Sequence, residues 1–448
     1  MNDPNSLPPS AIQPWLTRLG DELAQRQRDH LWRELSPVDG PQGAELCIGG
    51  KTYLQFCTNN YLGLASDPEV IDAARTALEH WGVGSGAARL VAGSMRSHHD
   101  LETDLAEFKH AEAALVFSSG YAANMAVLTT FAGARDLILS DKLNHASLLD
   151  AASASGAGCR TFQHRNYQRL TSLLDHYTSG NAASNRSPRQ GDGSPVTHPT
   201  GVLSPDGRGV AALADPVAET PPPKRQIWIV TDTVFSMDGD LADLAELASV
   251  ARKYEALLVT DEAHATGVLG PDGRGVAALY EAQRDVAVSV GTLSKAFGSI
   301  GGFVTGPRPV IDILMNRSRQ FIYTTALPAA CTAAARAALR ISRREPQRRQ
   351  RVLALARHVR QELSALGYQT GASESPIIPV VLGSAQRALE AAAYLREQNL
   401  FIPAIRPPTV PPHTARLRIS LMATHTDSHI DRLLSAMKKL GNHLHLVA

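Results

Sequence analysis

The sequence has few of the features that mark secreted, membrane or nucleic-acid-binding proteins. Its four cysteines show neither CxxC spacing nor a nearby histidine cluster, which argues against zinc and against a disulfide framework: Cys47, Cys57, Cys159 and Cys331. No apolar run reaches the roughly 18 residues that cross a bilayer, and the N-terminal stretch lacks the basic and apolar parts of a signal peptide. The formal net charge is only +1, so no overall field favours nucleic acid or an anionic membrane. We expect a cytoplasmic protein that binds anions through local groups.

Aromatic residues are also scarce, at 5% against 44% hydrophobic residues, so alanine and leucine must fill most of the core. A length of 448 residues predicts two or three domains. We divide the chain into an N-terminal arm and hairpin at 1–66, a large domain at 67–326 and a small domain at 327–448. The arm carries leucines at roughly helical spacing, which predicts an amphipathic helix: Leu16, Leu19, Leu23 and Leu31.

The large domain alternates short apolar runs with helical patterns. ALVF, LILS, CRTF, QIWIV, ALLV and VAVSV read as strands, and helix-like segments separate most of them. This alternation predicts a mainly parallel sheet with helices on both faces. Beyond Leu327 a long helical region, broken near Pro346, leads to the strand-like runs PIIPVVL, FIPAI and RLRISLM. The predicted fold class is α/β, with a large parallel-sheet domain and a small α+β domain.

One short segment occurs twice. GVLSPDGRGVAAL at 201–213 returns as GVLGPDGRGVAAL at 267–279, with Ser204 in place of Gly270. No third copy exists, which excludes a stacked-repeat fold. The first copy lies in a Ser-, Gly- and Pro-rich stretch at 180–223, which we interpret as a disordered or loosely attached surface insertion. Only the second copy follows a strand with polar residues at its end, so we expect no second site at the first.

The most informative stretch for chemistry is GTLSKAFGSIGG at 291–302. Lys295 follows an apolar strand and stands among small residues, where backbone can approach a ligand closely. A Schiff-base lysine needs such a place, because desolvation and neighbouring cations lower its pKa and free its amine. The alternative is an ordinary solvated lysine.

Polar residues at the ends of two further strands bear on this choice. IVTDTVFSMDGD and LLVTDEAHATG place Ser236, Asp261 and His264 at the carboxyl edge of the predicted sheet, where α/β proteins bind ligands. Asp261 and His264 alone could form a structural network or a metal pair, although no third ligand has suitable spacing.

Together with Lys295 these residues fit pyridoxal 5'-phosphate (PLP). PLP needs a lysine for its aldehyde and a carboxylate that keeps its ring nitrogen protonated. It also needs a phosphate cradle, and SSGYAANMAVL places Ser119, Gly120 and Tyr121 at a strand-to-helix turn with free N–H groups. Thr292 can add a hydroxyl. No metal is expected.

TLSKAFGSIGG, TDEAHATGV, VFSMDGD, DKLNHASLLDAA, TNNYLGLAS and FSSGYAANMAVL together resemble the α-oxoamine synthases among the fold-type I PLP enzymes. The similarity runs from about Asp21 to Leu440, apart from the insertion. The resemblance implies that Lys295 binds PLP and moves the substrate α-proton, that Asp261 pairs with the ring nitrogen, and that His264 contacts the phenolic oxygen. Further cofactor contacts implied by the resemblance come from Ser119, Gly120, Tyr121, Ser236, Thr292 and, across a dimer interface, Thr324 or Thr325.

The resemblance also implies substrate contacts. His145 corresponds to the histidine that stacks on the cofactor and orients a thioester, and Arg418 to the arginine that holds the amino-acid carboxylate. Asn59, Arg406 and Thr409 are further candidates near the substrate. Arg416 shares a strand face with Arg418, so one of the two could be a salt-bridge partner instead. The arm has HLWREL where relatives are more basic, which leaves Arg33 as a weak candidate.

The stretch 404–420, AIRPPTVPPHTARLRIS, resembles the members that join L-alanine to a pimeloyl thioester in biotin synthesis. The implied enzyme is a homodimeric acyltransferase with its active site at the interface, and its acyl donor is a thioester of coenzyme A or of acyl carrier protein. Members that use glycine or serine, such as 2-amino-3-ketobutyrate CoA ligase, 5-aminolevulinate synthase and serine palmitoyltransferase, remain alternatives. An inactive scaffold subunit is the non-enzymatic alternative.

Overall fold

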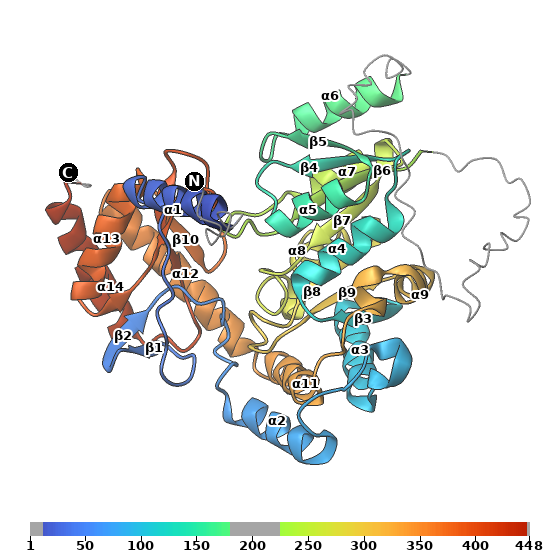
Figure 1. The fold of residues 1–448 in the computed structure, drawn as a ribbon, viewed down its shortest axis with the longest axis horizontal. Helices are drawn as coiled ribbons and strands as arrows, with labels where there is room; N and C mark the ends of the chain where they lie inside the picture. Colours follow the sequence, from blue (N-terminus) through green and yellow to red (C-terminus); the bar gives the residue numbers. More distant parts are fainter. Residues whose placement is uncertain (1–11, 180–224, 446–448) are drawn as a thin grey trace, which may run out of the picture.

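The computed structural model describes residues 12–179 and 225–445 (Figure 1). The predicted insertion at 180–223, and with it the repeat copy at 201–213, lies outside the described residues. Within the described ranges, no helix is both long and apolar enough to cross a membrane.

The large domain is built on a seven-stranded sheet in the order β3-β9-β8-β7-β6-β4-β5. The strands β8, β7, β6, β4 and β5 run parallel, and β9 lies antiparallel between β8 and β3. The sheet therefore confirms the predicted mainly parallel arrangement. Its strands are β3 (Ala113–Phe117), β4 (Leu137–Asp141), β5 (Gly158–Phe162), β6 (Ile227–Asp232), β7 (Leu257–Asp261), β8 (Val286–Thr292) and β9 (Gly302–Gly306).

Helices cover both faces of this sheet, because its central strands are apolar on both sides. Alternate residues enter different cores: Leu115 of β3 packs with one helix layer and Val116 with the other. One layer contains α4 (Gly120–Phe131), α5 (Ala146–Ala154), α9 (Arg308–Arg317) and α10 (Arg319–Ile322). The other contains α3 (Arg96–Lys109), α6 (Tyr167–Thr178), α7 (Leu244–Lys253) and α11 (Ala329–Arg344).

The small domain contains the antiparallel sheet β10-β13-β12 and three long helices. Its elements are β10 (Ile377–Gly383), β12 (Ala404–Ile405), β13 (Ala415–Ser420), α12 (Pro346–Ala365), α13 (Ala385–Glu397) and α14 (Asp427–His443). The predicted hairpin is confirmed as β1 (Glu45–Ile48) and β2 (Lys51–Gln55), which β11 (Leu400–Phe401) extends in parallel. FIPAI, predicted as one strand, is therefore two short strands in separate sheets.

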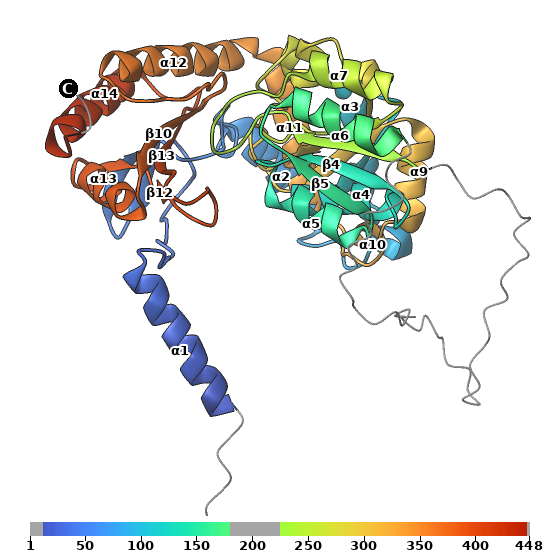
Figure 2. The same cartoon turned by 90° about the horizontal axis from the view of Figure 1, so that it is seen from above.

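Helix α11 begins just after the predicted domain boundary at residue 327 and packs on the large domain. α11 lies against α2 (Pro68–Trp81) and α3 of the large domain, and Arg336 of α11 forms ion pairs with Asp100 and Asp104 of α3. The helical region breaks at Pro346 as predicted, and α12 then crosses to the small domain (Figure 2). The passage between the domains therefore follows α11.

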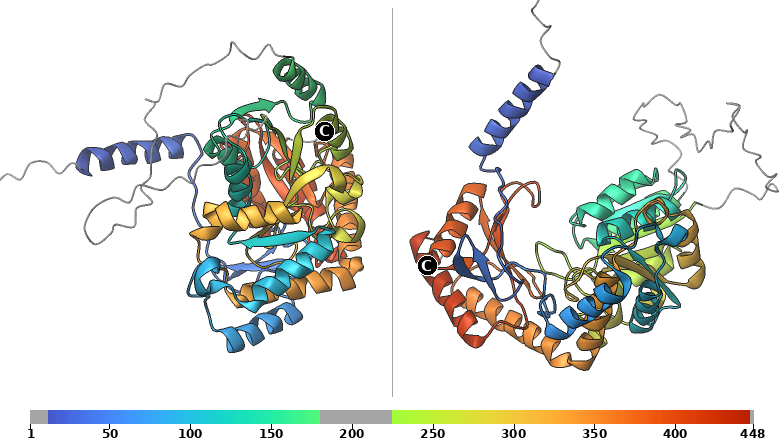
Figure 3. Two further views of the ribbon diagram at one scale, coloured as in Figure 1. Left: turned by 90° about the vertical axis from the view of Figure 1, so that its right-hand side faces the viewer. Right: turned by 60° about the horizontal axis from the view of Figure 1, so that its bottom comes forward.

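The predicted N-terminal helix is confirmed as α1 (Ile12–Arg28), although Leu31 lies beyond its end. None of its residues is buried, and Trp15, Leu16 and Leu23 are exposed. The helix extends away from the rest of the chain (Figures 2 and 3).

The second repeat copy forms a tight turn that leads from β7 into α8 (Val276–Leu279). Gly270 has φ +75°, and a Cβ atom there would lie 2.1 Å from the Gly275 carbonyl oxygen. The first copy has Ser204 at this position, so its sequence lacks a glycine that this turn requires.

Candidate active site

A cavity of about 630 Å³ lies between the two domains, at the carboxyl edge of the sheet. The ends of β4, β6, β7 and β8 meet there, because parallel strands deliver their last residues to the same edge. Seven of the predicted site residues line it: Asn59, His145, Ser236, His264, Lys295, Thr409 and Arg418.

Lys295 lies three residues beyond β8. Thr292 holds the start of this turn: its hydroxyl donates to the Gly301 carbonyl oxygen at 2.9 Å and lies 2.8 Å from the Ser294 hydroxyl. Burial lowers the pKa of Lys295 to about 8; Asp261 and Asp232 oppose this shift, and Arg418 adds to it. The neutral amine, which a nucleophile or base requires, is therefore far more populated near neutral pH than in an ordinary lysine.

Two carboxylates stand side by side at the ends of β6 and β7. Asp232 and Asp261 are register partners and both are buried. Asp261 accepts hydrogen bonds from the Asn124 side-chain amide at 2.6 Å and from the Ala263 backbone N–H at 2.8 Å. Asp232 accepts the His145 backbone N–H at 2.6 Å. Burial and the neighbouring Asp261 raise the pKa of Asp232 well above its ordinary value.

Asp232 and Asn124 were not among the predicted site residues. A signal for Asp232 is present in the sequence, because β6 and β7 both end in Val-Thr-Asp and these triplets pair in register. Asn124 has no comparable signal, since its position one turn into α4 reveals its partner only after folding.

His264 is held by a residue that was also not predicted. The Tyr61 hydroxyl lies 2.7 Å from His264 Nδ1, and its oxygen is 3.5 Å from an Arg418 guanidinium nitrogen. Burial lowers the pKa of His264 well below its ordinary value, and Lys295 and Arg418 add to this. The imidazole is therefore neutral, and the Tyr61 hydroxyl beside it also donates to Asn59 Oδ1 at 3.2 Å.

His145 is the N-cap residue of α5, so the start of that helix sets its position. Its Nδ1 lies 2.8 Å from the Ser147 hydroxyl, and Ser147 in turn accepts from Asn124 at 2.9 Å. Burial lowers the pKa of His145; Asp261 opposes this and Lys295 adds to it. The ring is neutral and lines the cavity.

The two arginines of β13, Arg416 and Arg418, have different bonding partners. Arg416 forms an ion pair with Asp238 and donates to the Thr414 carbonyl oxygen at 2.9 Å. Arg418 has no carboxylate partner among the described residues. Its guanidinium donates instead to the Ser236 carbonyl oxygen, the Ser420 hydroxyl and Asn59 Oδ1. Arg418 thus presents an unneutralised charge to the cavity.

The loop that carries Ser236 is anchored from behind by His164. Its two ring nitrogens face Asp141, at 3.1 Å, and Asp240, at 2.8 Å. Burial alone would lower the pKa of His164, but the hydrogen bonds with both carboxylates outweigh it and raise the pKa to about 9. The ring also packs edge-on against Phe235, which lines the cavity.

The predicted phosphate cradle lies at the start of α4. Ser119 caps this helix by accepting the Ala122 N–H at 3.0 Å, and the first turn of a helix offers further N–H groups to an anion. A Cβ atom on Gly120 would lie 3.5 Å from Thr292, so these two predicted residues are neighbours. A Cβ atom on Gly302 would lie 2.4 Å from the Ser119 carbonyl oxygen, which shows how closely β9 underlies the turn.

Some predicted residues do not reach the cavity. Thr324 and Thr325 lie in a separate small pocket with Ser118. Arg406 donates to the His30 and Trp32 carbonyl oxygens of the arm and is not part of the cavity lining. The Tyr121 side chain is half-exposed and donates to Asp150 at 2.6 Å.

Arg33, the weak candidate of the arm, does approach the cavity rim. Its guanidinium donates to the Pro407 carbonyl oxygen and to the Thr409 hydroxyl, each at 3.3 Å.

These groups have the chemistry that PLP requires. An amine with a lowered pKa stands beside two carboxylates, and a capped helix start adjoins the Thr292 hydroxyl. Within the described part of the chain, no group of three or more histidine, cysteine or acidic residues could hold a metal ion.

Residues 51–437 match the family model described as aminotransferase class I and II. An 8-amino-7-oxononanoate synthase of Methylococcus capsulatus is 43% identical over 407 residues, which cover 91% of this chain and 93% of that protein. The same-named protein of Hahella chejuensis is 41% identical over 422 residues, or 94% of this chain and 95% of that protein.

Solved structures share the fold. Serine palmitoyltransferase from S. paucimobilis with bound PLP–myriocin aldimine superimposes with a TM-score of 0.82 at 28% identity, covering 96% of this chain and 99% of that one. The 8-amino-7-oxononanoate synthase of Francisella tularensis gives 0.68 at 25% identity, covering 88% and 99%.

Proposed function

The chain belongs to the aminotransferase class I and II family, and we propose that it is the PLP-dependent acyltransferase that joins L-alanine to a pimeloyl thioester, forming 8-amino-7-oxononanoate. The observation that carries this proposal is that Lys295 of the large domain and Arg418 of the small domain face one cavity. An amino acid bound by its carboxylate at Arg418 can therefore present its α-carbon to Lys295.

In the reaction, a carbon–carbon bond forms between the alanine α-carbon and the thioester carbonyl carbon, and the carbon–sulfur bond breaks to release the thiol. The alanine carboxylate leaves as CO2, and the α-carbon takes up a proton. Bound PLP serves as the electron sink that stabilises negative charge at the α-carbon.

The chain's own residues bind, orient and move protons. Lys295, with its pKa lowered to about 8, takes the proton from the α-carbon and returns it at the end. Asp261, oriented by Asn124, would hold a proton on the ring nitrogen of bound PLP. His145 lines the cavity as a neutral ring, which suits a donor to the thioester carbonyl oxygen. Arg418 fixes the carboxylate and so the orientation of the Cα–H bond.

Several finer points belong to the proposal. The working unit is a homodimer in the cytoplasm, with Thr324 or Thr325 reaching the partner's cofactor phosphate; their separation from this chain's cavity supports that arrangement. Ser236 contacts the cofactor ring, and Arg33 with Thr409 contributes to substrate entry. The acyl group arrives on coenzyme A or on acyl carrier protein.

The test is a panel of L-alanine, glycine and L-serine against acetyl, succinyl, pimeloyl and palmitoyl thioesters, with products identified by mass. We expect alanine with the pimeloyl thioester to give the highest kcat/KM, on coenzyme A or on acyl carrier protein. Preference for glycine or serine would assign the chain to another branch of the family. Absence of turnover with all pairs, in protein that holds PLP, would refute the acyltransferase assignment.

A further inference from the structure

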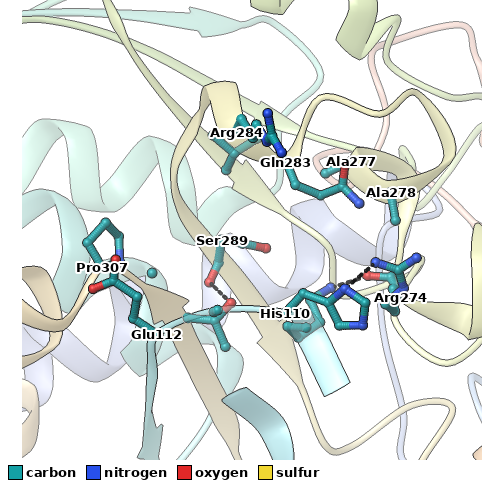
Figure 4. A pocket seen from close by; sticks show the side chains of 14 residues that line it. His110, Glu112, Arg274, Ala277, Ala278, Gln283, Arg284, Ser289 and Pro307 are labelled. Atoms are coloured by element: carbon teal, nitrogen blue, oxygen red, sulfur yellow. Dashed lines mark hydrogen bonds between the residues drawn. The ribbon is translucent and has the colours of Figure 1, made fainter. Parts of the chain in front are cut away.

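A second cavity, of about 290 Å³, lies at the opposite edge of the same sheet (Figure 4). The end of α3, the start of β8, the end of β9 and the turn of the second repeat copy enclose it. Nothing in the acyl-transfer reaction uses this edge, because the reacting groups all follow the carboxyl ends of the strands.

The lining of this second cavity is rich in positive charge. Lys109, Arg274 and Arg284 all contribute to it, and none of the three forms an ion pair with a carboxylate in the described part of the chain. The one carboxylate of the lining, Glu112, already accepts the Arg308 backbone N–H at 2.9 Å. The lining therefore has more cations than carboxylates.

Two polar atoms of the lining are buried without a partner in the described ranges, namely the Ser289 hydroxyl oxygen and Arg274 Nε. Burying a polar atom without a hydrogen-bond partner is unfavourable, so such atoms call for an explanation. Both belong to residues of the same cavity, and Figure 4 shows Ser289 and Arg274 on two sides of it.

Arg274 is held in place by its neighbours. One guanidinium nitrogen is 3.0 Å from His110 Nδ1, and the buried Lys109 ammonium donates to the Arg274 carbonyl oxygen and to the Thr266 hydroxyl. Because the guanidinium is positioned before any ligand arrives, little conformational entropy is lost on binding.

We propose that this cavity is a binding site for a small anionic molecule, whose carboxylate or phosphate group is held by Arg274 and Arg284 and whose remaining atoms pack on Ala277, Ala278 and Val286. The volume lies just below the usual range for small-molecule sites, which favours a ligand smaller than a nucleotide. Charge-assisted hydrogen bonds from planar guanidinium groups suit both carboxylate and phosphate oxygens.

Hydrogen bonds and chain continuity connect this site to the catalytic edge of the sheet. Residues Val276 and Ala277, next to Arg274 in the turn, donate their backbone N–H groups to the buried Glu262 at 2.9 Å each. Glu262 follows Asp261 in the chain. Burial lowers the pKa of Lys109, with Glu262 opposing and Arg274 adding to the shift, so an anion in the cavity favours the charged lysine.

The experiment follows thermal unfolding of the PLP-saturated protein in sodium phosphate or sodium propionate, up to about 50 mM, against sodium chloride of equal ionic strength. PLP saturation keeps the phosphate cradle filled, so added phosphate reports on other sites. We expect Tm to rise with phosphate, with propionate or with both, and the active salt identifies the anionic group.

Arg284→Gln changes an exposed residue and tests the site without disturbing the core, while Arg274→Gln removes the anchored guanidinium. Each should raise the half-saturating concentration at least about tenfold, as expected for one lost charge-assisted hydrogen bond. Arg317→Gln, on the exposed last turn of α9, is the matched control and should respond like the wild type. An equal rise of Tm in both site variants, or no rise above the chloride series in the wild type, would overturn the proposal.

Discussion

The two edges of the central sheet differ in how their charged residues are paired. At the carboxyl edge, the cations Lys295 and Arg418 share their cavity region with the paired carboxylates Asp232 and Asp261. At the amino edge, three cations line a cavity whose single carboxylate is already engaged by a backbone N–H. The carboxyl edge sets carboxylates of the chain beside its cations, whereas the amino edge has three cations and one carboxylate.

The difference lies in what each edge can bind. A catalytic lysine must lose its proton during turnover. Burial lowers the pKa of Lys295, and the nearby carboxylates and Arg418 adjust that shift in opposite directions, which holds the pKa in a useful range. The amino-edge cavity has three cations and only one carboxylate in its lining, so it favours an anion directly. The same strands therefore support chemistry at one end and anion binding at the other.

The strongest test of the catalytic edge is Lys295→Ala. We expect turnover to fall by at least about 10³-fold, because both the covalent anchor of PLP and the proton carrier are removed. The visible absorbance of the lysine-bound cofactor should disappear, as measured by a spectrum of the PLP-saturated variant. A variant with normal kcat and spectrum would show that the chemistry lies elsewhere.

The paired carboxylates can be separated by Asp261→Asn and Asp232→Asn. Asp261→Asn should lower kcat by about 10²-fold, since the ring nitrogen loses its charged partner. Asp232→Asn should cost less than about tenfold, because the raised pKa of Asp232 already favours its neutral form, which asparagine resembles. Steady-state kinetics with saturating PLP measure both, and equal losses would contradict the assignment of Asp261 alone.

The connection between the edges depends on Gly275. Its φ is +115°, and a Cβ atom there would lie 2.2 Å from Glu262 Oε2. Gly275→Ala should therefore lower the free energy of unfolding by about 2–4 kcal/mol. Gly133→Ala is the control, since a Cβ atom at Gly133 meets nothing within 4 Å. Urea unfolding of both variants measures the difference; equal stability would mean that the turn relaxes freely.

The smallest expected effect concerns His164, behind the catalytic edge. Its folded pKa of about 9 exceeds the unfolded value of about 6.5, so its contribution is complete below pH 6.5 and disappears as pH rises through about 9. The stability difference between wild type and His164→Gln should shrink by at most about 3 kcal/mol across that window. Urea unfolding at several pH values measures it, and a difference that does not vary with pH would refute the charged pairing.

Much of the catalytic edge could be predicted from the sequence. Lys295, Asp261 and His264 come at or soon after the ends of apolar strands. Because a parallel sheet brings the ends of its strands together independently of loop conformation, these residues could be expected to share one site. Asn124 and Tyr61 were missed because their partners, Asp261 and His264, lie far along the chain. Asp232 was missed although the Val-Thr-Asp triplet shared by β6 and β7 marks it.

The fold, like the site, could be predicted only in part from the sequence. Periodicity predicted the strands of the large domain, but not that β11 would join β2 instead of continuing into β12. Nor could it show that α11 packs on α2 and α3, because an alanine-rich helix suits either domain. The second cavity was beyond prediction, since its lining comes from four separated segments.

The helix α12 joins the wall that holds Lys295 to the wall that holds Arg418. Its 20 residues make a continuous rod of about 30 Å, starting at Pro346. As a lever, a rod of this length converts a rotation of about 2° at its start into a displacement of about 1 Å at its far end. A rotation that leaves every single contact near Pro346 intact can thus change the width of the catalytic cavity. A displacement of this size is enough to move reacting atoms out of reach of one another.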